Sequence, residues 1–174
     1  MNRILKIATV LTWINMIIWS LLCLNLIFNV VTSGATAFLI ILVFFSAIVL
    51  HSYASFQLQK SIRNPAVPLN SQTSTGIRFI GVVALFLGLL FVIVGIAILT
   101  NAAAVLKFLQ DYMKDMQPKA AGNEMNFTWT ISLVRMLGLV YLLIGLFVAV
   151  NVNLNFRLLR WYYYIHSNPD NQEK

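Results

Sequence analysis

The chain alternates long apolar stretches with short polar connections. Four stretches, at about 7–31, 35–56, 77–100 and 130–156, are strongly apolar, and none contains Asp or Glu. Because an α-helix rises about 1.5 Å per residue, about 20 apolar residues cross a hydrocarbon core of about 30 Å. We therefore predict an all-α polytopic membrane protein in which four transmembrane helices form a bundle.

A shorter pattern lies between the third and fourth stretches. Val105, Leu109 and Tyr112 recur at helical spacing, whereas Lys107 and Asp111 fall on other faces. The pattern predicts an amphipathic helix at about 102–117 that lies on the outer surface of the bilayer.

Composition and charge support a membrane protein. The 174 residues are 60% hydrophobic and 10% charged, well away from the roughly one quarter of charged residues in a soluble domain. The net charge of +7 comes from cations that flank the apolar stretches, so we expect contacts with membrane lipids and none with nucleic acid. With one cysteine, Cys23, the chain has no internal disulfide.

The distribution of basic residues predicts the orientation. One side carries Arg3, Lys6, Lys60, Arg63, Arg78, Arg157, Arg160 and Lys174, and the other carries Lys107, Lys114, Lys119 and Arg135. Because the basic side faces the cytoplasm, both termini are expected there, most consistently in a bacterial cytoplasmic membrane. We predict one membrane domain at 1–166 and a polar tail at 167–174.

Polar side chains inside the apolar stretches are the first candidates for function. Asn15, Asn25, Asn29 and His51 either line a polar pathway or form hydrogen bonds between helices. A metal or haem site at His51 would need a second ligand, and the only other histidine, His166, lies beyond the last stretch. We therefore expect no metal, no cofactor and no catalytic residue.

Two segments resemble one another, which suggests an internal repeat. Residues 56–60 read FQLQK and residues 156–160 read FRLLR. Two parallel hairpins would give this similarity, but so would the common preference of inner helix ends for aromatic, leucine and basic residues.

Asn151, Asn153 and Asn155 alternate, so the three cannot share one helical face, and we expect them at the inner interface.

Glycines recur every seven residues in the third and fourth stretches. They are Gly81, Gly88 and Gly95, followed by Gly138 and Gly145. Small residues at heptad spacing let two helices approach closely, so we predict a helix-packing seam, formed within the chain or between chains.

Three arginines are candidates for contacts with lipid or for an ion pair. Arg63 and Arg78 flank the loop before the third stretch, where they could contact anionic lipid. Arg135 lies near the outer boundary of the fourth stretch, where an ion pair with Asp111 or Asp115 would fix the amphipathic helix.

The sequence favours a small non-enzymatic integral membrane protein. Proton relays and intramembrane acid or base catalysis usually need a buried carboxylate, and the stretches contain none. An accessory, assembly or regulatory subunit that contacts another membrane protein is our first interpretation. A homo-oligomeric channel or uncoupled carrier for a small solute is the alternative, and an enzyme acting on lipid headgroups is a third.

Overall fold

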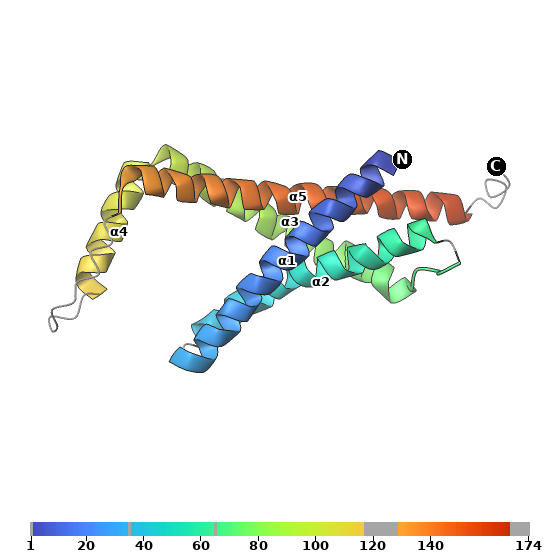
Figure 1. Ribbon diagram of the computed structural model, residues 1–174, viewed down its shortest axis with the longest axis horizontal. Coiled ribbons are helices and arrows are strands. Elements are labelled where there is room, and N and C mark those ends of the chain that lie inside the picture. Colours follow the sequence, from blue (N-terminus) through green and yellow to red (C-terminus); the bar gives the residue numbers. More distant parts are fainter. Residues whose placement is uncertain (1, 35, 65, 117–128, 168–174) are drawn as a thin grey trace. The chain divides into compact units, whose positions relative to one another are not determined.

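The computed structural model describes residues 2–34, 36–64, 66–116 and 129–167, and these residues form helices and no strand. The helices are α1 (Asn2–Ser33), α2 (Ala37–Arg63), α3 (Ser71–Thr100), α4 (Ala102–Met116) and α5 (Ile131–Ser167) (Figure 1). All except α4 are long and apolar enough to cross a membrane. This confirms the predicted all-α, four-span membrane fold. The position of α4 on the bilayer surface stays a prediction, and residues 168–174 of the predicted tail lie outside the described residues.

The helix ends follow from local sequence. Gly34 adopts φ 65° after α1 and donates its N–H to the carbonyl of Val30 at 3.0 Å, which satisfies a terminal carbonyl in a conformation that glycine adopts without strain. Asn70 caps α3, because its side-chain oxygen accepts the N–H of Gln72 at 3.0 Å. The helix therefore begins six residues before the apolar stretch at 77–100.

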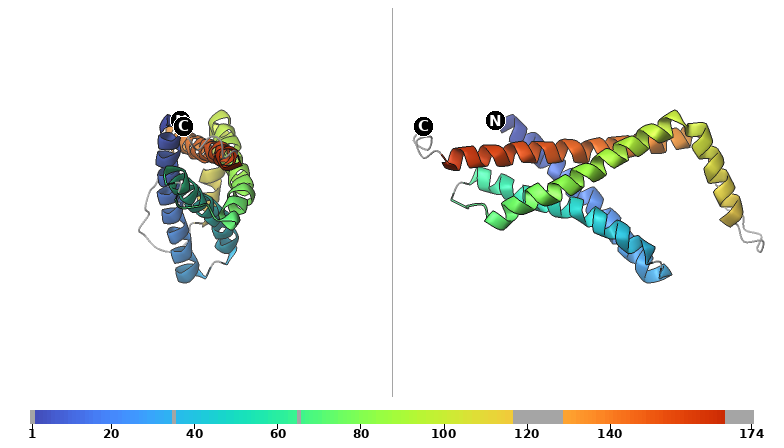
Figure 2. Two further views of the ribbon diagram at one scale, coloured as in Figure 1. Left: turned by 90° about the vertical axis from the view of Figure 1, so that its right-hand side faces the viewer. Right: turned by 180° about the vertical axis from the view of Figure 1, so that it is seen from behind.

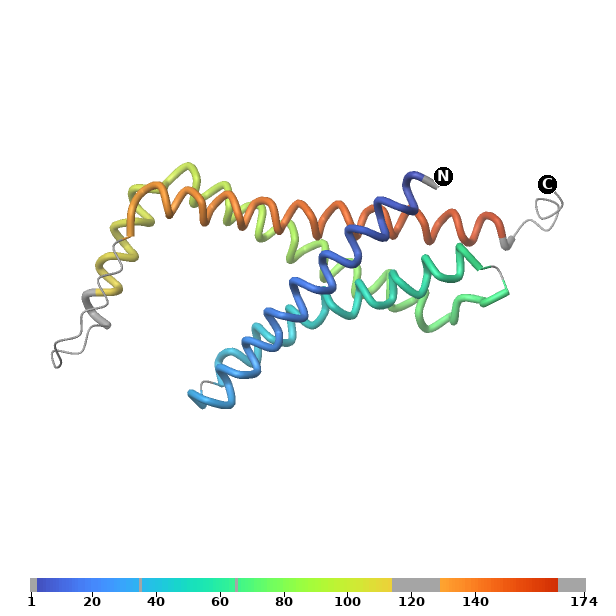
Figure 3. Tube along the Cα trace, in the orientation of Figure 1, coloured from blue at the N-terminus to red at the C-terminus, as the bar shows by residue number. Residues whose placement is uncertain are grey.

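Contacts divide the chain into two compact units, with boundaries inside α3 and α5. Unit 1 comprises Met1–Gly88 and Phe147–Lys174, and unit 2 comprises Leu89–Leu146. The single domain at 1–166 stays a prediction. In unit 1, α1 and α2 form a hairpin, and the trace in Figure 3 follows it in blue and cyan. A buried apolar cluster joins all four helices of this unit and comprises Ala8, Leu58, Ile77, Leu158, Leu159 and Tyr162.

Buried residues recur with the same spacing in two pairs of helices of unit 1. Ala8, Thr12, Asn15 and Trp19 of α1 correspond to Ile77, Gly81, Ala84 and Gly88 of α3, each 69 positions later. Ile48, His51, Ser52, Ser55, Leu58 and Gln59 of α2 correspond to Val148, Asn151, Val152, Asn155, Leu158 and Leu159 of α5, each 100 positions later. Any packed helix face buries residues three or four apart, so the shared spacing agrees with an internal repeat, which stays a prediction. We call positions related by these offsets equivalent.

In unit 2, the second half of α3 lies alongside the first half of α5 (Figure 2). A Cβ atom at Gly95 would lie 2.6 Å from the backbone nitrogen of Leu142 and 2.8 Å from the carbonyl oxygen of Gly138. The ring centroids of Phe91 and Tyr141 are 5.5 Å apart. Glycine at these positions therefore permits backbone contact between the two helices.

Candidate functional site

Four buried polar side chains join α1, α2 and α5 in one hydrogen-bond network. Gln59 donates both amide hydrogens, to Thr12 Oγ1 at 3.0 Å and to Asn155 Oδ1 at 3.0 Å. Thr12 then donates to Asn151 Oδ1 at 2.9 Å, and Asn155 donates to the same oxygen at 3.0 Å. Donors and acceptors thus alternate from Gln59 to Asn151, and the network holds three helices together.

Asn15 extends the polar contacts between α1 and α5. Its side chain is buried and donates to the carbonyl oxygen of Phe147 at 3.3 Å. Of the two roles considered for Asn15, this contact has the geometry of an interhelical hydrogen bond.

The equivalent positions on α3 and α2 carry different chemistry. His51, equivalent to Asn151, is 1% exposed, and its Nε2 lies 3.3 Å from Ser55 Oγ. A Cβ atom at Gly81 would lie 2.6 Å from the Phe156 ring and 2.9 Å from His51 Cε1, and the two rings are T-shaped at a centroid distance of 6.2 Å. Among the described residues, no three His, Cys, Asp or Glu side chains group as metal ligands. Burial and these contacts make His51 a closely packed side chain of unit 1.

Asn25 and Asn29 lie on a different face of α1. Asn29 Nδ2 donates to Asn25 Oδ1 at 3.0 Å and to the Asn25 carbonyl at 2.8 Å, so these bonds stay within the helix. Asn25 is exposed and Asn29 is half-buried.

One end of unit 1 is strongly basic. Its described residues include Arg3, Lys6, Lys60, Arg63, Arg78, Arg157 and Arg160, and none is Asp or Glu. Helix contacts bring this end together: Tyr162 Oη accepts the N–H of Leu69 at 3.0 Å, and Tyr163 shares a short hydrogen bond with Ser74. The cations therefore gather without a carboxylate in the described part of the unit.

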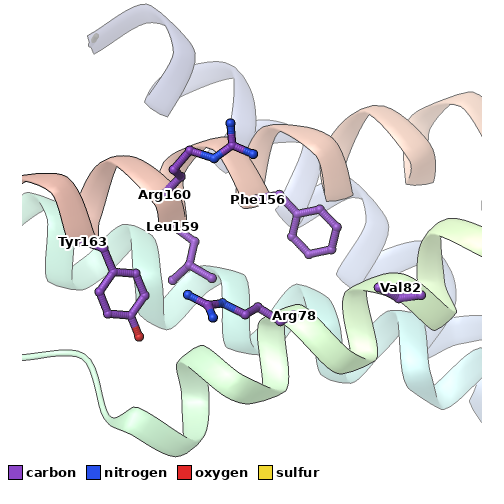
Figure 4. Close-up of a pocket in the computed structure, with 6 residues that line it drawn as sticks. All are labelled: Arg78, Val82, Phe156, Leu159, Arg160 and Tyr163. Atoms are coloured by element: carbon purple, nitrogen blue, oxygen red, sulfur yellow. The ribbon is translucent and has the colours of Figure 1, made fainter.

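A pocket of about 460 Å³ opens between α3 and α5 at the basic end (Figure 4). It is lined by Arg78, Val82, Phe156, Leu159, Arg160 and Tyr163. The Arg78 guanidinium carbon lies 5.3 Å from the centroid of the Tyr163 ring. Arg63, which we grouped with Arg78 from sequence, instead donates to Thr9 Oγ1 on α1 at 2.8 Å.

The glycines of the predicted seam are all buried: Gly81, Gly88, Gly95, Gly138 and Gly145. Gly95 and Gly138 of unit 2 meet within the chain, since a Cβ atom at Gly138 would lie 3.1 Å from the Gly95 carbonyl. Arg135 is exposed, as is Asp111, and the side chain of Asp115 lies outside the described part. The ion pair between Arg135 and either aspartate stays a prediction.

Sequence reasoning missed several residues of these sites. We expected Asn151, Asn153 and Asn155 together at the inner interface, but Asn151 and Asn155 are four apart and share a buried face, whereas Asn153 is exposed. The offset of 100 was a usable signal, because it relates Asn151 and Asn155 to His51 and Ser55. Gln59 and Arg160 lie in the two segments that resemble one another, at 56–60 and 156–160, but that resemblance gave neither a role, and Tyr163 had no signal beyond its place near a helix end.

Fold and sites together define the class: a four-span helical membrane protein with a polar core between helices and a basic pocket at one end. Comparison with family models, with curated protein sequences and with solved structures finds no match.

Proposed function

We propose that the chain is a non-enzymatic accessory or assembly subunit that binds a transmembrane helix of another membrane protein. The observation that carries the proposal is that the buried amide side chains of unit 1 are bonded inside it, while the surface groove between α1 and α2 is apolar. The amides bond to one another between helices, while an apolar groove lies open between α1 and α2. The outer surface of the α1–α2 hairpin is therefore suited to contact with another transmembrane helix.

The groove has the size and composition of a helix-binding surface. It measures about 600 Å³ and is lined by Ser20, Cys23, Leu24, Ile27, Leu42, Val43, Ser46, Val49 and Leu50. Small residues let a partner backbone approach closely, and the flanking leucine, isoleucine and valine side chains add van der Waals contact. Ser46 donates to the Val43 carbonyl at 2.7 Å, so its hydroxyl is satisfied without the partner.

Native mass spectrometry of the protein extracted gently from its own membrane tests the proposal. We expect a second protein at fixed stoichiometry, and we expect Ser46→Phe, which fills the groove, to remove it. Val31→Phe is the matched control, because Val31 is 77% exposed on the same hairpin and does not line the groove. A complex that survives Ser46→Phe, or a groove that carries only lipid, would contradict the assignment.

Cys23 provides an independent readout at the groove. It is the only cysteine of the chain and is half-buried there. A bound helix should slow its alkylation by a membrane-permeant maleimide in native membranes, and detergent extraction that separates the partner should restore the rate.

A homo-oligomeric channel or uncoupled carrier is the second candidate, and Asn25 favours it. Its side-chain oxygen accepts from Asn29, but the residue is exposed on α1 about 12 Å before the end of that helix, where a polar group that is not fully hydrogen-bonded is costly in hydrocarbon. In an oligomer, these amides would face a shared pathway. Solute flux into liposomes that Asn25→Leu abolishes, together with a homo-oligomer in the mass spectrum, would favour this candidate over the first.

The proposal includes no catalysis and places both termini in the cytoplasm. Packing of His51 against Gly81 and Phe156 argues against substrate access to the imidazole. The gathering of cations at one end of unit 1 supports the orientation, because basic residues favour the cytoplasmic side. Reporter fusions at each terminus would test it, and a periplasmic signal from either would contradict it.

A further inference from the structure

We propose that the pocket between α3 and α5 binds the phosphate headgroup of an anionic phospholipid. The inference does not depend on a protein partner, because it concerns a different face and a different ligand. It rests on the residues that line the pocket, on their equivalents in the other half of unit 1, and on the charge around them.

The pocket is amphiphilic. Arg78, Arg160 and Tyr163 supply two guanidinium groups and a phenol, and Val82, Phe156 and Leu159 supply apolar walls. Figure 4 shows Arg78 reaching from α3 toward Tyr163, whereas the Arg160 guanidinium projects from α5 on the side away from Arg78. A phospholipid whose phosphate lies beside Arg78 would place its acyl chains along Val82 and Phe156. This combination fits a phospholipid better than free phosphate, which has no apolar part.

Comparison of the two halves shows why this pocket is open. All six lining residues have equivalents, which are Thr9, Trp13, Phe56, Gln59, Lys60 and Arg63. Trp13 packs edge-on against Phe56 at a centroid distance of 5.4 Å, and Arg63 donates to Thr9. In the α3–α5 half, the small Val82 stands where Trp13 stands in the other half. An indole thus occupies space on one side that remains open on the other.

Electrostatics favour an anion at this site. Arg78 lies about 11 Å from the start of α3, and Arg160 lies about the same distance from the end of α5, so both are near the depth of lipid headgroups if those ends meet water. The described part of unit 1 offers neither of them a carboxylate. A lipid phosphate would supply the missing charge through charge-assisted hydrogen bonds.

Titration of the full-length protein with phosphatidylglycerol and phosphatidylcholine of matched acyl chains, read by native mass spectrometry, tests the site. We expect about tenfold tighter binding of phosphatidylglycerol, and about a tenfold loss of that affinity in Arg78→Gln, the change expected for one hydrogen bond to a charged group. Lys60→Gln is the matched control, because Lys60 is exposed and equivalent to Arg160. It should change the affinity less than twofold, since it removes one charge outside the pocket.

Val82→Trp separates the pocket from diffuse attraction. It places at the α3–α5 site the side chain that fills the equivalent position, and it leaves net charge unchanged. We expect it to lower phosphatidylglycerol affinity about as much as Arg78→Gln, in protein that elutes as a single species. If the tryptophan variant does not fold, Arg78→Gln at an exposed position still decides the question.

Three results would overturn the proposal. One is equal affinity for the two lipids. Another is a loss in Lys60→Gln as large as that in Arg78→Gln. The third is complete displacement of the lipid by a molar excess of inorganic phosphate, which would identify a free-phosphate site instead.

Discussion

Thr12 and Gly81 occupy equivalent positions in the two halves of unit 1, but Thr12 contacts the smaller side chain of Asn151 and Gly81 lies against the larger side chain of His51. Thr12 Oγ1 donates to Asn151 at 2.9 Å, whereas a Cβ atom at Gly81 would lie 2.6 Å from the Phe156 ring and 2.9 Å from the imidazole of His51. Because Asn151 and His51 are also equivalent, the larger side chain on one helix is matched by the smaller on the other. Both pairs are therefore closely packed, but the first is joined by a hydrogen bond and the second by van der Waals contact.

This relationship predicts that the two residues of one pair can be exchanged together. His51→Asn alone should leave a cavity and Gly81→Thr alone should overpack the site, so each should lower the free energy of unfolding by about 1–3 kcal/mol. The double variant reproduces the pair Asn151 and Thr12, so we expect it to recover at least about 1 kcal/mol. Unfolding in mixed detergent micelles, followed by circular dichroism, measures the cycle.

The control for this cycle combines His51→Asn with Gly76→Thr. No atom lies within 4 Å of a Cβ placed at Gly76, so these two changes should be additive. Additivity in the Gly81 cycle as well would show that the two halves are not interchangeable at this position.

The amide network predicts that Gln59 stabilises unit 1 more than its neighbours in the helix do. Gln59→Leu removes two donors and leaves Asn155 Oδ1 without its partner from α2. Interhelical hydrogen bonds in membranes average about 0.6 kcal/mol, with a maximum of about 1.7, so we expect a loss of about 1–3 kcal/mol. Gln57→Leu, outside the network, is the control, and an equal effect in the two variants would contradict the role of Gln59.

The number and type of helices could be predicted because long apolar stretches without carboxylates have few other stable structures. The side-chain contacts between the helices could not be predicted. Gln59 lies beyond the apolar stretch at 35–56, and only the crossing of α2 with α1 and α5 brings it to Thr12 and Asn155. A hydrogen bond between helices depends on crossing geometry, which helical periodicity alone does not specify.

The basic pocket shows a second limit of sequence reasoning. Arg63 and Arg78 are neighbours along the chain across one loop, which is why they were grouped. In the folded unit Arg63 contacts Thr9 on α1, and Arg78 shares a pocket with Arg160. The importance of Val82 emerges only when α3 is compared with α1, because burial reveals the offset of 69 that relates them.

The glycines should differ in their tolerance of a methyl group according to what that group would meet. At Gly95 it would lie 2.6 Å from a backbone nitrogen, which cannot move aside, whereas at Gly81 the nearest atoms belong to the Phe156 and His51 side chains. We expect Gly95→Ala to lower the free energy of unfolding by about 1–3 kcal/mol and Gly81→Ala to lower it less. Gly76→Ala should be neutral or stabilise α3 by up to about 1 kcal/mol. Thermal unfolding of the three variants checks the order, and a stable Gly95→Ala protein would contradict close contact of α3 and α5 in unit 2.

If the indole of Trp13 fills the place that Val82 leaves open, then Trp13→Val should create a second lipid site. Lys60 and Arg63 are equivalent to Arg160 and Tyr163, so the new pocket would also be basic, with Arg63 turning from Thr9 to the lipid phosphate. Native mass spectra should then show a second bound phosphatidylglycerol, and Arg63→Gln in the same background should remove it. Trp13→Phe keeps an aromatic ring against Phe56 and should bind one lipid. A single lipid in the Trp13→Val protein would mean that residues other than Val82 open the natural pocket.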